Sequence, residues 1–384
     1  MTTAPLQRAR EIAADLVAKH ADEVDRDARF PGEALDALRT AGLIGTALRP
    51  QDGGEDTSLA EVAAITRELG RHCSSTGMIF AMHQIQLFIL RNHVEDGPLA
   101  DFRRRVGTEQ LLLASATTEI NIGGDTRSSG CAIQPGADGT VTLSKNAPVI
   151  SYGRYADAVL ATARRTPDSV PSDQSLMVCL AGDGSTLTLT EISGWDTLGF
   201  RGTCSNGFLL EAGGPADYVL AEGYDAISSR TQLPVAHLLW SSLWLGMAEQ
   251  AAHQAAVVVK KEARRKLGTT PPAALRLAEL MLTVQQLEQS VLGMIRRYEQ
   301  AASTPDGCAD LQFATAINTL KVSASRLLLD IVSEAMVICG ISGYRNDSAT
   351  SLGRVLRDAF GASVMVNNDR ILHNNAQLLL AVQA

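Results

Sequence analysis

Apolar side chains recur at intervals of three and four residues over the first part of the chain. One such series comprises Leu6, Ala9, Ile12, Ala13 and Leu16. A second helix is expected to begin at Pro31 and to end before Gly42, and a longer, more apolar one to cover residues 78–90. This spacing is that of helices with one buried face. The pattern therefore predicts an N-terminal helical domain at residues 1–112.

The pattern changes near Leu111 to short runs in which apolar and β-branched residues alternate with polar ones. The runs cover residues 141–143, 158–161, 175–180 and 186–190. Gly, Asp, Ser and Pro separate them, as is typical of tight turns between strands. The expected structure is a compact β domain, similar to a barrel or a sandwich, at residues 113–222.

Long amphipathic segments return after Pro234. They cover residues 238–260, 273–298, 308–339 and 358–382, and the joins between them are short. Such segments predict an antiparallel four-helix bundle at residues 223–384. The fold class is thus mainly α with a central β domain. Because strands and helices do not alternate and no G-x-G-x-x-G is present, a Rossmann fold is not expected.

Charge and cysteine usage exclude several classes of function. The 384 residues carry a formal net charge of -8, which argues against a protein that binds nucleic acid. Apolar runs such as 238–247 are too short to span a bilayer, and residues 1–30 have no signal-peptide pattern. No membrane partner is expected, and the location is expected to be cytoplasmic. The six cysteines are scattered without a C-x-x-C spacing, so neither a disulfide framework nor a metal site is expected.

Five motifs follow one another in an order that matches a known family. They are AGLIG with a following Pro and Gly-Gly (41–54), TEINIGGD (118–125), VIS (149–151), GFRGT with Ser205 (199–205), and GISGY with LRDA (340–359). They resemble the GLxGxxxPxxxGG, TEPGAGSD, Trp-Ile-Thr/Ser, GMRGSxT and GGxGY…RDA segments of the acyl-CoA dehydrogenase superfamily. One match would be weak, but five in order cover nearly the whole chain. The resemblance implies the helix–β–helix fold and a flavin cofactor.

The resemblance also implies where the flavin is bound. Thr118 would meet the pyrimidine edge of the ring and Ser151 would lie near its N5 atom, which suits the alternating donors and acceptors of a flavin. Ordinary half-buried hydroxyl groups are the alternative for both. The full set of implied cofactor residues is Thr117, Thr118, Gly123, Gly124, Val149, Ser151, Gly340, Ile341 and Asn368.

The cofactor is expected to be FAD, with FMN as the alternative, because Val337 stands where the family commonly has a Gln that contacts the adenine end. In the family, the segment that corresponds to Val337–Ile341 touches that end from a partner subunit. The resemblance therefore implies a homodimer or a homotetramer.

The catalytic carboxylate of the family has no counterpart at its usual place. Counted from Arg357-Asp358-Ala359, the usual Glu position holds Val366, and the alternative position on the first bundle helix holds Ala236. The catalytic residue is therefore unassigned. Asp369 and His373 are the candidates for a replacement. A helix N-cap is the plainer role for Asp369, and an ordinary core or surface histidine is the plainer role for His373.

Two further residues are candidates for binding the substrate. The resemblance places His237 and Arg201 near the ligand, where His237 could bind a carboxylate or phosphate or exchange a proton near neutral pH. A packing role for His237 has equal weight. Trp240 and Trp244 share one helix face, and they line a pocket or, more commonly for large aromatic residues, fill the bundle core.

Three functions remain open. The first is a dehydrogenase of an acyl thioester, bound to CoA or to a carrier protein, which passes electrons to an electron-transfer partner. The second is a monooxygenase of the same fold, which takes reduced flavin from a reductase and uses O2 on another organic substrate. Small polar residues such as Ser151, Asn367 and Asn368 would suit a site that stabilises a peroxide. The third is a flavin-binding protein without catalysis. The absent Glu favours the second, but the dehydrogenase is the best single prediction.

Overall fold

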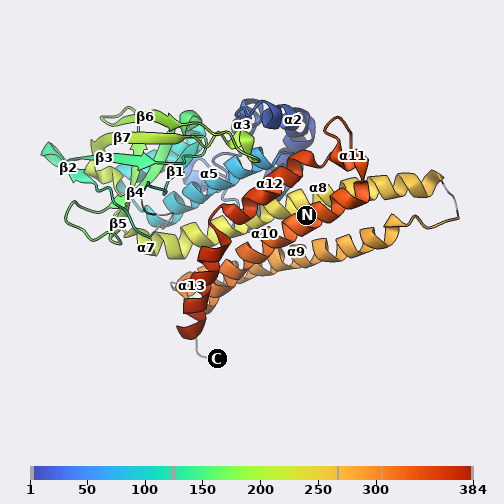
Figure 1. Ribbon diagram of the computed structural model, residues 1–384. Coiled ribbons are helices and arrows are strands. Elements are labelled where there is room, and N and C mark those ends of the chain that lie inside the picture. The colour runs from blue at the N-terminus through green and yellow to red at the C-terminus, as the bar shows by residue number, and fades with distance from the viewer. Residues whose placement is uncertain (1–3, 121, 123–126, 266–267, 305, 382–384) are drawn as a thin grey trace.

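The N-terminal part of the computed structural model, which describes residues 4–120, 122, 127–265, 268–304 and 306–381, is helical. Its helices are α1 (Ala4–Ile12), α2 (Ala18–Arg26), α3 (Gly32–Thr40), α4 (Leu59–His72), α5 (Ser74–His93) and α6 (Gly97–Glu109). Ser58 and Glu61 form a capping box that begins α4. Helix α5 is buried on nearly every face, because it packs against α4, α8 and β1 at once. It therefore joins the three parts of the molecule (Figure 1).

The central part consists of two sheets (Figure 1). One has the order β1 (Leu113–Ala116), β4 (Ala158–Arg164), β5 (Gln174–Leu180), with β1 parallel and β5 antiparallel to β4. The other is antiparallel, with the order β2 (Gln134–Pro135), β3 (Thr140–Ala147), β7 (Gly207–Pro215), β6 (Thr186–Ser193). All four predicted runs lie within strands. Strand β7 was not among them, although it is an inner strand of its sheet.

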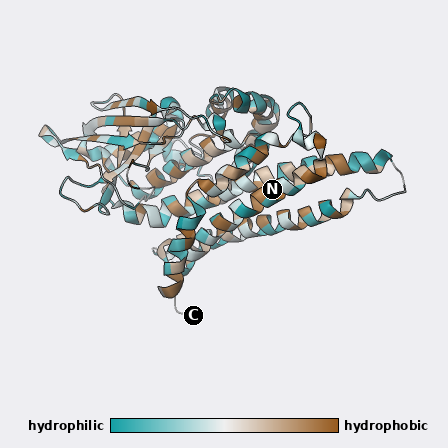
Figure 2. Ribbon diagram, viewed as in Figure 1, coloured by the Kyte–Doolittle hydropathy of each residue, from teal (hydrophilic) through white to brown (hydrophobic). Residues whose placement is uncertain are grey.

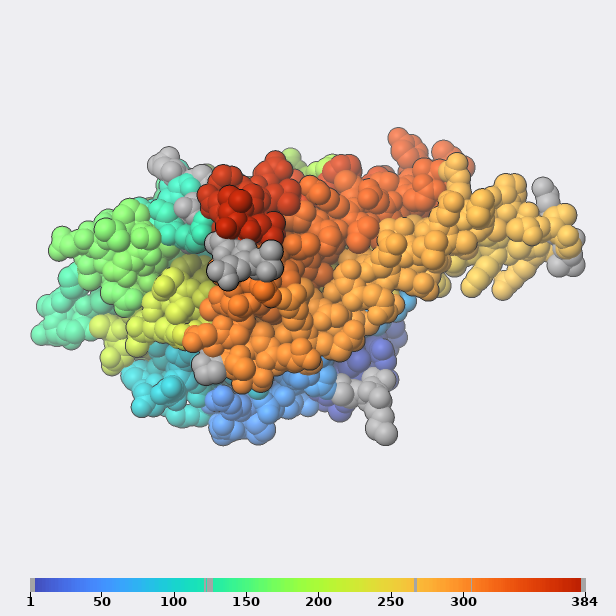
Figure 3. Space-filling view, turned by 90° about the horizontal axis from the view of Figure 1, so that it is seen from below, coloured from blue at the N-terminus to red at the C-terminus, as the bar shows by residue number. Residues whose placement is uncertain are grey.

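The C-terminal part is a bundle of long helices. It contains α8 (Leu233–Arg265), α9 (Ala273–Ala302), α10 (Leu311–Cys339), α12 (Gly353–Val364) and α13 (Asn368–Ala381), with the short α7 (Tyr224–Ile227) and α11 (Ile341–Tyr344). The end of α8 that projects furthest from the β domain is hydrophilic (Figure 2). In Figure 3, α9 and α10 form a long exposed ridge. No helix among the described residues is apolar enough over a sufficient length to cross a membrane.

One predicted helix is wrong. The single helix expected over 358–382 is two helices, α12 and α13, separated by a turn at residues 365–367. The last backbone bond of α12 runs from Met365 N–H to the Gly361 carbonyl, and Val366 then adopts a left-handed conformation with φ +47°. A residue in this conformation cannot continue a right-handed helix.

Two histidines are buried in neutral form. His83 on α5 accepts a hydrogen bond from Leu113 N–H at Nδ1 and donates from Nε2 to the Ile44 carbonyl, both at 2.9 Å. Burial lowers the pKa of His83 to about 4. His237 on α8 bonds the Ile317 backbone, and burial, followed by the charge of Lys321, lowers its pKa to about 3. Neither environment accommodates an imidazolium.

Stability is expected to fall as the pH falls from about 6.5 towards 4. In this range the unfolded chain protonates both His83 and His237, whereas the folded chain does not. Each proton contributes about 1.4 kcal/mol per pH unit to the loss of unfolding free energy. Urea unfolding at pH 5, 6 and 7 measures the slope. In His83→Gln the slope should decrease by about one proton, and an unchanged slope would contradict the assignment.

Candidate functional site

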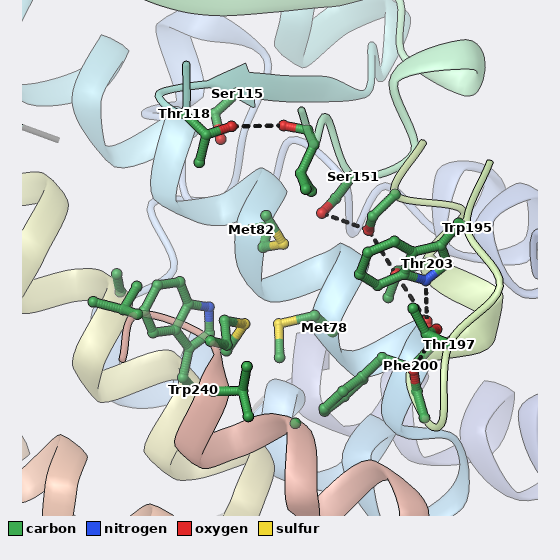
Figure 4. A pocket seen from close by; sticks show the side chains of 18 of the residues that line it. Met78, Met82, Ser115, Thr118, Ser151, Trp195, Thr197, Phe200, Thr203 and Trp240 are labelled. Atoms are coloured by element: carbon green, nitrogen blue, oxygen red, sulfur yellow. Dashed lines mark hydrogen bonds between the residues drawn. The ribbon is translucent and has the colours of Figure 1, made fainter. Parts of the chain in front are cut away.

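A cavity of about 560 Å³ lies where the β domain meets helices α5, α8 and α12. One wall comes from segments that follow β1 and β3 and from residues 195–205. The other wall comes from the helices, and Figure 4 shows the side chains of both walls pointing into the space between them. The volume is within the usual range for pockets that hold a cofactor or ligand.

The first wall begins at the end of β1 and continues directly after it. Ser115, Thr117 and Thr118 line the cavity there, and the Thr118 hydroxyl donates to the Val149 carbonyl at 3.0 Å. Val149 follows β3 and also lines the cavity. This bond therefore joins two segments that are 31 residues apart in the chain and holds them side by side at the cavity.

A chain of three hydroxyl groups continues this wall (Figure 4). The Ser205 hydroxyl donates to Ser151 Oγ at 2.8 Å, and Thr203 Oγ lies 2.7 Å from Ser205 Oγ. Backbone bonds support the chain, since Tyr152 N–H donates to the Thr203 carbonyl. A hydroxyl group has one hydrogen, and Ser151 accepts in its bond with Ser205. The Ser151 hydrogen is therefore left for a group in the cavity.

Residues 195–200 are fixed to α12 by one carboxylate. Asp358 Oδ1 accepts from Phe200 N–H at 2.5 Å, and its Oδ2 accepts from the Ser74 hydroxyl of α5. Burial raises the pKa of Asp358, and these two hydrogen bonds act in the opposite direction. Trp195 Nε1 donates to the Phe200 carbonyl at 3.0 Å. Asp358 thus connects both walls of the cavity.

The helical wall is mainly apolar, although Gln86 of α5 and Gln232, directly before α8, also line the cavity. Met78 and Met82 of α5, Trp240 of α8 and Phe360 of α12 line it. Among the described residues that line the cavity, the charged side chain is Arg357. Its guanidinium group donates to the Asp25 carboxylate and the Leu198 carbonyl, so its charge is compensated at the edge of the cavity.

Both positions that lack the family carboxylate lie at this cavity. Val366 and Ala236 line it from the α12–α13 turn and from α8. The lining residues that the structure describes include no Asp, Glu, His, Lys, Tyr or Cys side chain. The cavity therefore offers, within the described residues, no side chain suited to accept a proton from carbon at neutral pH.

Several candidate residues lie away from the cavity. The Asp369 N–H donates to Asn367 Oδ1, so Asn367 rather than Asp369 caps α13, and His373 is exposed beside Gln377. Arg201 is held by Asp196 and the Asp25 carbonyl. The structure brings none of Asp369, His373 and Arg201 into the cavity lining.

The remaining candidates lie at three other places. His237 is buried in the bundle, and Asn368 is buried against α10. Gly340 ends α10 with φ +58°, and the Ile341 side chain is 74% exposed. An adenine site that involves this segment stays a prediction, as does the oligomeric state. Gly123 and Gly124 lie outside the described residues.

Four of the cofactor candidates lie together at one cavity wall, where their role in binding flavin stays a prediction, and most of the helical wall was not foreseen from the sequence. Thr117, Thr118, Val149 and Ser151 line the cavity together. Of the two tryptophans on α8, Trp240 lines it, whereas Trp244 is buried in the bundle. Met78 and Met82 gave no signal beyond their helical spacing, which is equally typical of core residues.

The residues that are present fit a flavin ring. The first wall offers backbone groups of the Thr118 segment and the Ser151 hydroxyl hydrogen, which is not used in the bond with Ser205. These groups suit the polar edge of an isoalloxazine. Trp195 and Phe200 close the same side, and the opposite helical wall is mainly apolar. A flat aromatic ring with one polar edge therefore matches the distribution of polar groups here.

Two family models match the chain. The acyl-CoA dehydrogenase N-terminal domain matches residues 3–93, and the C-terminal domain matches residues 222–366. The cyclohex-1-ene-1-carbonyl-CoA dehydrogenase of Geobacter metallireducens is 24% identical over 95% of this chain and 94% of its own length.

Solved structures share the fold. FMN-bound TdsC of Paenibacillus sp. A11-2, a dibenzothiophene monooxygenase, superposes with a TM-score of 0.84 at 19% identity, over 99% of this chain and 98% of that one. Butyryl-CoA dehydrogenase of Megasphaera elsdenii gives a TM-score of 0.80 at 19% identity, over 98% and 97%. Enzymes of two different reactions thus share this architecture.

Proposed function

The chain belongs to the acyl-CoA dehydrogenase superfamily and is a flavin-dependent oxidoreductase, and from this premise we propose that it is a monooxygenase. In this proposal, one oxygen atom of O2 is transferred to an apolar organic substrate in the cavity, and the other leaves as water with two protons. The two electrons come from reduced flavin, which a separate reductase supplies. FAD and FMN both occur in the superfamily.

The apolar character of both carboxylate positions carries this proposal. Removing a proton from the carbon next to a thioester carbonyl requires a base, and a well-placed base contributes about 10²–10⁴-fold to the rate. Val366 and Ala236 stand at the two positions, and the described lining offers no substitute. Oxygen transfer to an apolar substrate needs no such base. The fold shared with TdsC supports the same proposal by analogy.

The chain's own residues would have three roles in this reaction. Thr118 and Val149 would hold the polar edge of the flavin, and the Ser151 hydroxyl would donate its free hydrogen near the reacting part of the ring. Met78, Met82 and Trp240 would bind the apolar substrate and exclude water. A dry site strengthens the hydrogen bonds that orient the cofactor.

Dehydrogenation of an acyl thioester is the second candidate. It is favoured by the sequence relatives, such as the cyclohex-1-ene-1-carbonyl-CoA dehydrogenase. In that reaction, two electrons and two protons would leave the substrate, and an electron-transfer protein would reoxidise the flavin.

Two assays with flavin-loaded protein are expected to distinguish the candidates. Anaerobic mixing with a panel of acyl-CoA thioesters should leave the flavin oxidised. Supplying reduced flavin, a flavin reductase and isotopically labelled O2 should give labelled product from a panel of indoles and aromatic thioethers. Bleaching by a thioester without O2 would contradict the monooxygenase and support dehydrogenation.

The assignment of Ser151 to the flavin site can be tested separately from the reaction. Ser151→Ala should raise the dissociation constant of the flavin about 2–10-fold, the usual effect of one lost hydrogen bond. Ser144→Ala is the matched control, because Ser144 is an exposed residue of β3. Equal flavin binding by the two variants would refute the assignment of Ser151.

A further inference from the structure

A buried lysine of the bundle holds the turn that separates α12 from α13. Lys321 of α10 is fully buried, and its ammonium group donates to the Val366 carbonyl at 2.6 Å and to Asn368 Oδ1 at 2.8 Å. Ser325, one helical turn further along α10, accepts from Asn368 Nδ2 at 3.0 Å. Two side chains of α10 therefore form hydrogen bonds with the backbone and with one side chain of this turn.

The turn that they hold is strained. Val366 has φ +47°, a left-handed conformation that a β-branched residue adopts only when its surroundings impose it. The same residue lines the cavity. A released turn would relax towards right-handed conformations and move the Val366 side chain, so the shape of this part of the cavity wall depends on what holds the turn.

We propose that Lys321 is a positioning residue that holds Val366 in its left-handed conformation and thereby shapes the cavity wall for the bound flavin and substrate. The inference rests on the cavity being the flavin site of the proposed function, but not on which reaction takes place there. Lys321 acts through Val366 and does not line the cavity itself.

The surroundings of Lys321 also make this contact sensitive to pH. On the turn and α13 it faces the neutral Val366 carbonyl and Asn368, and on α8 it faces the Trp244 ring, 5.8 Å away, and His237. His237 is neutral above about pH 3, and no carboxylate pairs with Lys321 among the described ion pairs. Burial lowers the pKa of Lys321 to about 7. The ammonium form donates the stronger hydrogen bonds, so the turn is held most firmly below that pH.

Lys321→Met in flavin-loaded full-length protein tests the inference. Loss of two charge-assisted hydrogen bonds is expected to weaken FMN or FAD binding about tenfold. The wild-type affinity should fall as the pH rises through about 7, and the variant should lose this dependence. Adding Val366→Gly should restore the affinity to within about twofold, because glycine adopts a positive φ without strain. A Lys321→Met protein with wild-type affinity and pH profile, or a failed rescue by Val366→Gly, would overturn the proposal.

Asn368→Asp provides a test that keeps the contact. A carboxylate beside the ammonium group should raise the pKa of Lys321, and the inflection in flavin affinity should move upward by about one pH unit or more. An unmoved inflection would also overturn the proposal, even if Lys321→Met did not fold. If the wild type binds no flavin, the proposed function fails. A double-mutant cycle of Lys321→Met and Val366→Gly then still tests whether Lys321 holds the conformation of Val366. Additive changes in the free energy of unfolding, measured in urea, would refute this coupling.

Discussion

Gly246→Ala is expected to lower the free energy of unfolding by about 3 kcal/mol, near the upper end of the usual cost of overpacking. Gly246 lies where α8 crosses α4. A β-carbon at this position would lie 2.0 Å from the Arg67 carbonyl oxygen and 3.1 Å from Arg71 N. Both are backbone atoms of a helix, so the clash cannot be relieved by a change of rotamer. The helices would have to separate.

The separation of α4 and α8 should also change the shape of the cavity. Helix α8 carries Ala236 and Trp240 in the cavity wall, less than three turns before Gly246. Urea unfolding with and without flavin measures both effects. Flavin affinity should fall together with stability in Gly246→Ala.

Gly293→Ala is the matched control for this substitution. Gly293 lies within α9, and a β-carbon there would meet no atom within 4 Å. Alanine should stabilise this helix by roughly 0.5–1 kcal/mol, because it loses less conformational entropy than glycine on folding. Equal effects of the two substitutions would show that the α4–α8 crossing is not as tight as the structure has it.

The long helices could be predicted from sequence because each has its own apolar face. Residues 273–298, predicted from periodicity, form most of α9. Strand β7 was missed because Gly213 and Gly214 interrupt its alternation with residues that favour turns, while its pairing with β3 and β6 comes from distant parts of the chain. The left-handed conformation of Val366 was missed for a similar reason. No local signal marks a valine for positive φ, and the contacts that impose it come from Lys321, 45 residues earlier.

The candidate site was predictable only where the sequence carries a motif. Thr118 and Ser151 could be assigned because both lie in segments that resemble the family, and both line the cavity. Their partners are 31 and 54 residues away in the chain, and such distances cannot be read from periodicity. Met82 belongs to a helix that is buried on nearly every face, so its place at a cavity rather than in a packed core depends on how the β domain docks.

Asp358→Ala is expected to destabilise the fold by about 2–6 kcal/mol, because it leaves two buried hydrogen-bond donors without their partner. Asp358 is buried and accepts from the Ser74 hydroxyl and from Phe200 N–H. Both donors would lose their partner inside the protein, and an unpaired buried donor costs about 1–3 kcal/mol. Arg354 would also lose a nearby negative charge that favours its cationic form.

The same substitution should weaken flavin binding, because the backbone of Gly199 and Phe200 packs directly on α12. A β-carbon on Gly199 would lie 2.5 Å from the Arg357 carbonyl oxygen, so this loop packs tightly on α12, and Asp358 holds it there together with Arg357. Asp358→Asn keeps one oxygen for Phe200 N–H and should retain more flavin than Asp358→Ala. Asp347→Ala is the control, since Asp347 forms an exposed pair with Arg345 and such pairs contribute at most about 1 kcal/mol. If Asp358→Ala cost no more than Asp347→Ala in urea unfolding, Asp358 would not be the residue that joins the two walls. A retained flavin spectrum in a destabilised Asp358→Ala protein would instead separate its role in folding from its role at the cavity.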